Sequence, residues 1–68
     1  MKVTLKAARI AAGYKQAEAA KRLGCNTGTL ASYEAGKTFP DVMMLKKIEI
    51  LYGVSYNDII FVCDKITS

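Results

Sequence analysis

The sequence predicts an all-α domain built from short helices. Three observations support this class: apolar residues recur at helical spacing, glycines follow the segments with that spacing, and no segment carries a strand signal. The chain has 68 residues, which is room for one domain with one small core, so residues 1–68 are treated as a single domain. Short connections between the expected helices favour a compact bundle of crossing helices.

The first helix is expected at about residues 4–12. Thr4 can cap its start, because its hydroxyl can accept a hydrogen bond from a free amide of the first turn. Four residues then follow one another at the spacing of a single helical face: Leu5, Ala8, Arg9 and Ala12. Gly13 ends the helix, since glycine readily adopts the left-handed conformation that follows a last turn.

The second helix is expected at residues 16–23, an alanine-rich segment of high helix propensity, and Gly24 follows it as a left-handed cap. The third helix is expected from Thr27 to Ala35, with Asn26 as its N-cap and a glycine after its last turn. It therefore begins only about three residues after the second helix ends.

Two further helices complete the expected bundle. A loop precedes Pro40, because the residue before proline is biased away from helical geometry. Residues 41–52 form the fourth helix, since Asp41 suits the positive end of the helix dipole and apolar residues follow at helical spacing. Ser55 starts a last short helix that reaches about residue 61, with Asp58 as an acidic variant of the capping box.

The composition is that of a folded, basic domain. The chain is 51% hydrophobic and 24% charged, which is a globular rather than a disordered balance. Its formal net charge is +4, and this excess positive charge attracts polyanions. Nucleic acid is accordingly the first partner to consider, although charge alone does not decide it.

The inventory of reactive side chains argues against a metal site and against an enzyme. Cys25 and Cys63 form no CxxC pair and there is no histidine, so no structural zinc site can be assembled. Paired carboxylates and a glycine-rich phosphate loop followed by lysine are missing as well. We expect no cofactor and no small-molecule ligand. Cys25 is either a small apolar filler or a redox switch.

No signal segment opens the chain, and its longest apolar run is much shorter than the roughly 20 residues that span a bilayer. These features predict a cytoplasmic protein with reduced thiols that does not bind membranes.

Two helices joined by a tight glycine turn on a small basic domain are what a helix-turn-helix requires. Over about residues 5–60 the sequence resembles the phage repressor and Cro-type (XRE-like) helix-turn-helix family of regulators. The matching residues, all at the family's spacing, are Arg9, Gln16, Ala20, Gly24, Leu30, Tyr33, Glu34, Gly36, Pro40, Leu45, Ile48, Gly53, Val54 and Ser55. The resemblance implies a five-helix, lambda-repressor-like domain with a short tail at 61–68. It places the second helix across the phosphate backbone of double-stranded DNA and the third helix in the major groove.

The resemblance also assigns site residues. It implies base contacts by Thr27, Gly28, Ala31 and Ser32 and phosphate contacts by Gln16 and Arg9. Further phosphate contacts are expected from residues that flank the helix ends, which are Asn26, Lys37, Lys15 and Thr38. Arg9 and Glu34 are implied to form an ion pair that orients the third helix. The alternative for each polar residue is plain solvent exposure, and Lys2 and Lys6 are weaker candidates. Thr27 and Ser32 can discriminate only weakly between bases, because neither can make the bidentate hydrogen bonds that arginine makes to guanine or glutamine makes to adenine.

The sequence departs from the family at Ile10, Glu49 and Ile50. Because family members often dimerise through the end of the domain, the candidate dimer surface is Ile50, Ile59, Phe61 and Val62. The alternative is that the tail folds back and covers these side chains. A homodimer, at least on DNA, would match a two-fold operator.

The leading functional hypothesis is a sequence-specific DNA-binding transcriptional regulator that acts as a repressor. The alternative is a protein-interaction module, such as an antitoxin or a phage protein, that uses the same fold to bind a protein partner.

Overall fold

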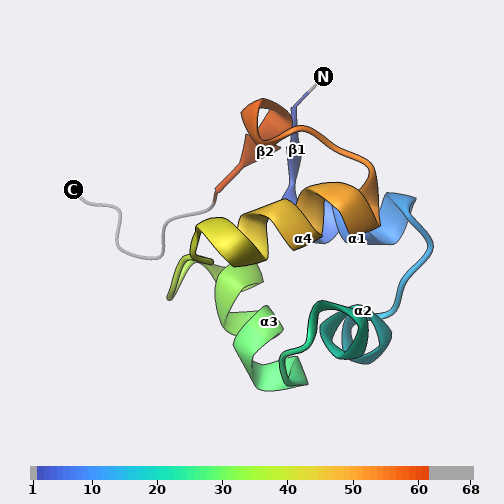
Figure 1. Ribbon diagram of the computed structural model, residues 1–68, viewed down its shortest axis with the longest axis vertical. Helices are drawn as coiled ribbons and strands as arrows, with labels where there is room; N and C mark the ends of the chain where they lie inside the picture. Colours follow the sequence, from blue (N-terminus) through green and yellow to red (C-terminus); the bar gives the residue numbers. More distant parts are fainter. Residues whose placement is uncertain (1, 62–68) are drawn as a thin grey trace.

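The computed structural model describes residues 2–61, which fold into four α-helices around one small core (Figure 1). The elements, in chain order, are β1 (Val3–Thr4), α1 (Leu5–Ala11), α2 (Gln16–Leu23), α3 (Thr27–Ala35), α4 (Val42–Tyr52), the 3₁₀ turn η1 (Tyr56–Asp58) and β2 (Ile59–Ile60). The first four predicted helices are confirmed to within one residue at each boundary. Within residues 2–61, no helix has the length and apolar character of a membrane-spanning segment.

Side chains cap the starts of three of the helices. Thr4 Oγ1 accepts a 3.1 Å hydrogen bond from the amide of Ala7, and Asn26 Oδ1 accepts one of 2.8 Å from Thr29. Asp41 Oδ1 accepts in the same way from Met44 at 2.9 Å. Each bond satisfies an amide that has no partner within its helix. α2 differs, because Lys15 at its N-cap position makes no such bond.

The turn between α2 and α3 depends on Gly24, as predicted. Its φ of 81° lies in the left-handed region, where a Cβ is strained, and its amide closes the last turn of α2. The chain is then free to reverse, and α3 begins at Thr27 after only Cys25 and Asn26. This short connection holds α2 and α3 against each other at a steep angle (Figure 1).

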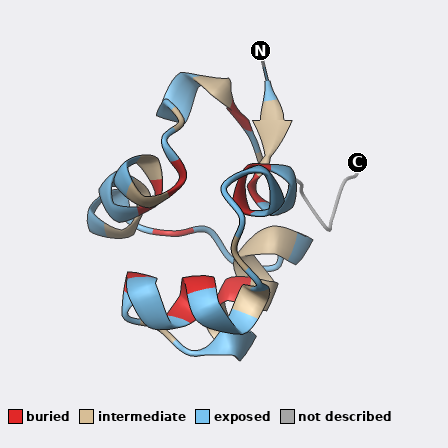
Figure 2. Ribbon diagram, turned by 90° about the vertical axis from the view of Figure 1, so that its right-hand side faces the viewer, coloured by how far each residue is buried: buried red, intermediate tan, exposed pale blue. Residues whose placement is uncertain are grey.

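The core lies where the inward faces of the four helices meet (Figure 2). Its largest fully buried side chains are Leu23, Leu30 and Ile48, which come from three different helices. Ala19 and Ala20 are also buried, and their small side chains allow α2 to approach its neighbours closely. The core thus holds α3 by one side only and leaves its opposite side in solvent.

The predicted fifth helix is wrong. Ser55 does start a turn, since its Oγ accepts from the amide of Asn57, but only one 3₁₀ turn forms. Ile59 and Ile60 then extend and pair in parallel with β1, in the register Val3 to Ile59 and Thr4 to Ile60. The prediction that the chain contains no strand is therefore also wrong. Two-residue strands are too short to show an alternating pattern, and these two join segments from opposite ends of the chain.

Glu49, one of the departures from the family pattern, holds this turn in place. Its Oε2 accepts a 2.6 Å hydrogen bond from the backbone amide of Tyr56, the first residue of η1. The carboxylate therefore serves as an external cap that joins α4 to the segment leading into β2.

The strand pairing also corrects part of the predicted dimer surface. Ile59 is only 7% exposed and belongs to the core, so it cannot form an outer contact. Phe61 is half-buried, with its ring 5.9 Å from the rings of both Phe39 and Tyr56. Ile50 stays 84% exposed, and Val62 lies outside the described residues.

The first helix is shorter than predicted by one residue at each end. Of the four residues at the spacing of one face, Leu5, Ala8 and Arg9 are buried, whereas Ala12, the C-cap of α1, is exposed.

Candidate nucleic-acid interface

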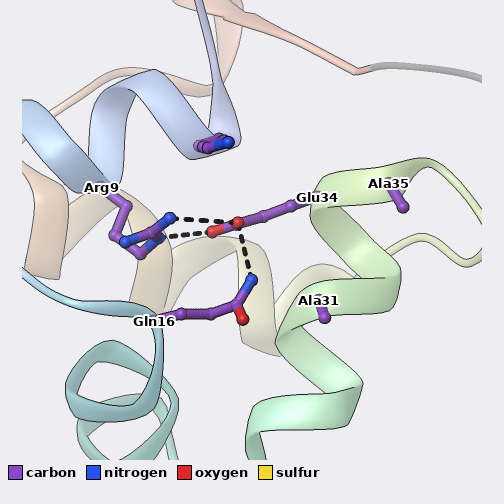
Figure 3. Close-up of a pocket in the computed structure, with 6 residues that line it drawn as sticks. Arg9, Gln16, Ala31, Glu34 and Ala35 are labelled. Carbon is purple, nitrogen blue, oxygen red and sulfur yellow. Dashed lines mark hydrogen bonds and ion pairs between the residues drawn. The ribbon is translucent and has the colours of Figure 1, made fainter.

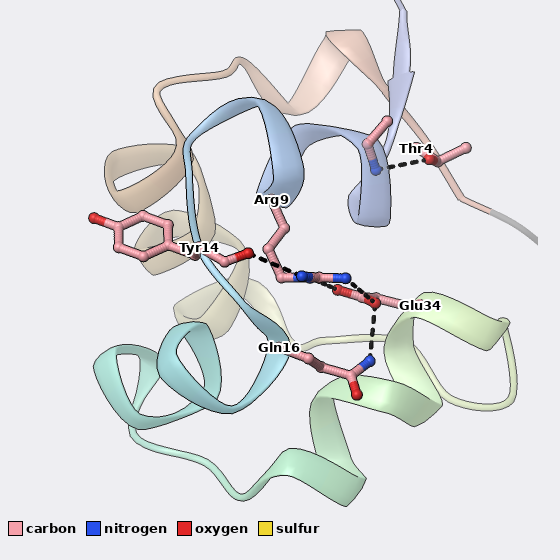
Figure 4. Close-up of polar contacts among 6 residues, drawn as sticks. Thr4, Arg9, Tyr14, Gln16 and Glu34 are labelled. Carbon is pink, nitrogen blue, oxygen red and sulfur yellow. Dashed lines mark hydrogen bonds and ion pairs between the residues drawn. The ribbon is translucent and has the colours of Figure 1, made fainter.

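A polar network joins α1, α2 and α3 beside the recognition-helix candidate α3 (Figures 3 and 4). Arg9 Nε donates to Glu34 Oε2 at 2.7 Å, and Arg9 Nη2 donates to Glu34 Oε1 at 3.4 Å. Gln16 Nε2, from the first turn of α2, donates to the same Oε1 at 3.0 Å. One carboxylate on α3 is thereby held by both preceding helices, and the ion pair implied by the family resemblance is present in this chain.

The ion pair is nearly inaccessible to solvent. The side chain of Arg9 is 8% exposed and that of Glu34 is 6% exposed. A third partner completes the site, since Arg9 Nη1 donates to the backbone carbonyl of Tyr14 at 2.9 Å (Figure 4). Burying two charges is tolerable only when each is paired and hydrogen-bonded, and both conditions are met.

The four predicted base-contact residues lie along α3, with Gly28 and Ser32 opposite Leu30 and Thr27 one turn before it. Thr27 and Gly28 in the first turn are exposed, whereas Ala31 and Ser32 one turn later are half-buried. Leu30 itself is fully buried. The structure therefore brings these four residues to one helix face, and their contacts with bases remain predictions.

Four of the predicted phosphate-contact residues lie at helix ends: Lys15 precedes α2, Asn26 precedes α3, and Lys37 and Thr38 follow α3. Lys15, Asn26, Lys37 and Thr38 are all exposed. The amide of Lys37 donates to the carbonyl of Ser32 at 3.0 Å, and that of Thr38 does so at 3.5 Å. These two amides are thus engaged by the C-terminal cap of α3, so a ligand would meet only the side chains of Lys37 and Thr38.

Asn26 has a divided role. Its Oδ1 accepts from both the amide and the hydroxyl of Thr29, each at 2.8 Å. Its Nδ2 donates to no group among residues 2–61 and is exposed with the rest of the side chain. The amide nitrogen can therefore serve an external acceptor while the oxygen caps α3.

A cleft of about 410 Å³ opens between α1 and α3 above the polar network (Figure 3). Its lining consists of Lys6, Arg9, Gln16, Ala31, Glu34 and Ala35. Residues from all three N-terminal helices thus face a single concave surface on the side of the molecule that carries α3.

Sequence reasoning missed the contribution of two tyrosines, Tyr14 and Tyr52. The Tyr14 ring lies 5.4 Å from the guanidinium carbon of Arg22 and 6.4 Å from the ring of Tyr52. Tyr14 also supplies the carbonyl that holds Arg9. Tyr52 belongs to the last turn of α4, and nothing in the sequence indicated that it would pack beside the ion pair.

The Tyr52 hydroxyl is buried and has no hydrogen-bond partner among the described residues. Burial raises the pKa of Tyr52 to about 12, and the neighbouring charge of Glu34 acts in the same direction. The protonated form is favoured because a phenolate here would lose its solvation close to a carboxylate.

Cys25, in the turn between α2 and α3, is a free and half-buried cysteine that packs against the core. Burial raises the pKa of its thiol, and the charge of Lys47 opposes this shift without cancelling it. Since the thiolate is the reactive form, this environment fits an apolar filler better than a redox switch. Among residues 2–61 no three histidine, cysteine or acidic side chains gather where they could hold a metal ion.

Comparisons with known proteins agree with this geometry. A family model described as helix-turn-helix matches residues 5–59. Over 51 residues the chain is 45% identical to the HTH-type transcriptional regulator ImmR of Bacillus subtilis (strain 168). This match covers 75% of the chain, but the chain spans only 40% of the length of that curated relative. A search of solved structures found no significant match.

We expect Glu34→Gln to lower the free energy of unfolding by about 3 kcal/mol, because it leaves the buried guanidinium of Arg9 without an anion. Urea denaturation followed by circular dichroism measures this change. Glu18→Gln, which alters an exposed carboxylate on α2, is the control and should change stability by less than about 0.5 kcal/mol. Equal effects of the two substitutions would show that the ion pair is not a stabilising constraint.

Tyr52→Phe should raise the free energy of unfolding by about 1 kcal/mol at neutral pH, because it removes a buried hydroxyl without a partner. Burial raises the pKa of Tyr52 to about 12, above the ordinary value of 10.0 that applies in the unfolded chain, so wild-type stability falls as pH rises from 10 towards 12. The advantage of the variant should therefore widen above pH 10 in urea titrations. Tyr56→Phe, at an exposed hydroxyl, is the control, and a destabilised Tyr52→Phe protein would contradict the prediction.

Proposed function

We propose that this chain, which belongs to the helix-turn-helix family of DNA-binding transcriptional regulators, binds specific double-stranded DNA sequences. By occupying these sequences it would regulate transcription. In this proposal α3 enters the major groove and α2 lies across the phosphate backbone. The observation that carries it is the buried network of Arg9, Glu34 and Gln16, which ties α3 to both preceding helices. A recognition helix held in this way can enter a groove without first being ordered.

The exposed face of α3 supports direct contact with base edges. Thr27 and Ser32 offer hydroxyls, Ala31 offers a methyl group that can pack on a thymine methyl, and Gly28 allows the backbone to come close. These side chains are small, so part of the discrimination is expected to come from the shape and deformability of the DNA.

The proposed phosphate contacts are hydrogen-bond donors near the helix ends that have no partner among the described residues. The first amides of α2 receive no side-chain cap, and Gln16 uses only one of its two amide protons on Glu34. Both can therefore meet a backbone phosphate, and the side chains of Lys15, Asn26, Lys37 and Thr38 flank the same face. Arg9 reaches a phosphate only with N–H groups not held by Glu34 and Tyr14, so its main role is to orient α3.

Repression is the proposed outcome of binding, because a domain that occupies a DNA site excludes other proteins from it. The relative from Bacillus subtilis carries the description transcriptional regulator, which is consistent with a regulatory role.

Selection of bound sequences from a random duplex library, followed by anisotropy titrations at several salt concentrations, tests this function. We expect one enriched sequence whose affinity falls steeply with salt, since displaced counterions oppose binding. No binding to any duplex at low salt would contradict the proposal and would favour a protein-interaction module instead.

We further propose that two copies associate through the outer face of α4. Val42, Met43 and Ile50 share this face and are 68%, 69% and 84% exposed, a large apolar fraction for so small a domain. Of the dimer surface predicted from the sequence, Ile50 belongs to this face, and half-buried Phe61 packs beside Phe39 and Tyr56. A second copy is the occupant that suits a DNA-binding domain, because two-fold proteins match two-fold operators. The same face would be the docking site in the protein-interaction alternative.

Light scattering after size exclusion should give two wild-type protomers on one operator duplex, whereas Ile50→Lys should give a single protomer on that duplex. The substitution places a charge in the apolar contact, so we expect it to weaken dimer formation at least tenfold while leaving the fold intact. Ile10→Lys, which places the same charge at an exposed isoleucine of α1, is the matched control and should leave the dimer intact. A wild-type monomer on operator DNA would rule out the dimer.

Gly28→Ala should stabilise the fold and impair DNA binding. Its φ is not positive and a Cβ there would meet only Asn26 Oδ1 at 3.6 Å, so we expect a gain of roughly 0.5–1 kcal/mol in urea titrations. The added methyl stands on the proposed groove face, so affinity or sequence preference should change. Gly24→Ala, at a positive φ, is the control and should destabilise. Unchanged binding of every sequence by Gly28→Ala would remove Gly28 from the interface.

A further inference from the structure

We propose that the cleft between α1 and α3 holds one sugar–phosphate strand of the bound duplex, with Lys6 as the contact for a backbone phosphate and Ala31 and Ala35 as the apolar wall. This assignment rests on the proposed function and extends the DNA contacts to α1. It also revises the rank of Lys6, which the sequence placed among the weaker candidates.

The charges around the cleft single out Lys6. Arg9 and Glu34 both line it, but they neutralise each other through two hydrogen bonds and are almost fully buried. Lys6 is exposed and makes no hydrogen bond or ion pair with any residue from 2 to 61. The uncompensated charge of the cleft is therefore the single positive charge of Lys6.

The position of the cleft relates Lys6 to the other proposed contacts. Gln16, at the start of α2, and Ala31, on the groove face of α3, line the same cleft (Figure 3). A DNA strand that touches both must pass across the opening between them. The ammonium group of lysine sits on a long flexible stem, so Lys6 can reach a phosphate of that strand without any movement of α1.

The opposite wall suits the sugar part of the strand. Ala31 and Ala35 are one helical turn apart on α3, and their methyl groups leave the cleft open. A larger side chain at either position would fill the space, whereas alanine allows a deoxyribose to approach the helix. Ala35 was not among the predicted contacts, and only the packing of α1 beside α3 brings it into the site.

The salt dependence of DNA binding tests the role of Lys6. Each neutralised phosphate of B-form DNA contributes about 0.9 to the slope of log affinity against log salt concentration. Lys6→Gln should therefore lower the magnitude of this slope by about 0.9 for each bound protomer and weaken binding to the selected duplex and to an unrelated duplex by the same factor. Lys6→Arg should retain the wild-type slope. Lys2→Gln, which removes an equal charge next to β1, where Lys2 Nζ donates to the carbonyl of Asn57, should also leave the slope unchanged.

Ala35→Leu tests the apolar wall. It should weaken binding to both duplexes by the same factor without changing the salt slope, because it fills the cleft but removes no charge. Circular dichroism and thermal unfolding establish that both variants are folded before binding is measured.

An unchanged slope for Lys6→Gln, or wild-type affinity for Ala35→Leu, would overturn the assignment of the cleft. Unequal loss on the two duplexes would also overturn it, since a backbone contact carries no sequence information. Failure of the proposed function is distinguishable, because the wild-type protein would then show no salt-dependent binding to duplex DNA.

Discussion

The buried ion pair between Arg9 and Glu34 is the constraint on which the arrangement of the helices depends. An unpaired charge at this depth costs several kcal/mol, so α1 and α3 must stay in the one geometry that satisfies both groups. Gln16 and the carbonyl of Tyr14 draw α2 and the preceding loop into the same network. A small domain thereby gains a precise relation among three helices that its limited apolar core would specify less sharply.

This network connects stability to the proposed function. Leu30 is the fully buried residue by which α3 packs into the core. Near the C-terminal end of α3, Glu34 joins the helix to the polar network. Thr27 and Gly28 therefore stay exposed and Ala31 and Ser32 half-buried, while the orientation of the helix is fixed. These small residues offer few specific base contacts in the proposed complex. Recognition of DNA therefore depends more on how α3 is positioned against the phosphate backbone than on any one base contact.

A second set of contacts joins the N-terminal and C-terminal segments of the described chain. β1 and β2 join segments from opposite ends, and Glu49 supplies an acceptor for the first amide of the turn between α4 and β2. This closure buries Ile59 and leaves the outer face of α4 apolar and exposed. The distribution gives the domain two distinct surfaces, a polar one around α3 and an apolar one along α4.

The sequence by itself determined the elements that depend on local chemistry. Helix spacing, the Asn26 cap and the left-handed glycine at Gly24 are set by neighbouring residues, so four helices and their turn were predictable. The resemblance to a known family supplied the pairing of Arg9 with Glu34. Only the tertiary structure decided the strand pairing of Ile59 and Ile60, the burial of Tyr52 beside the ion pair and the meeting of Lys6 with Ala35 across one cleft. Each of these joins residues distant in sequence, and no local pattern records which distant segments will pack together.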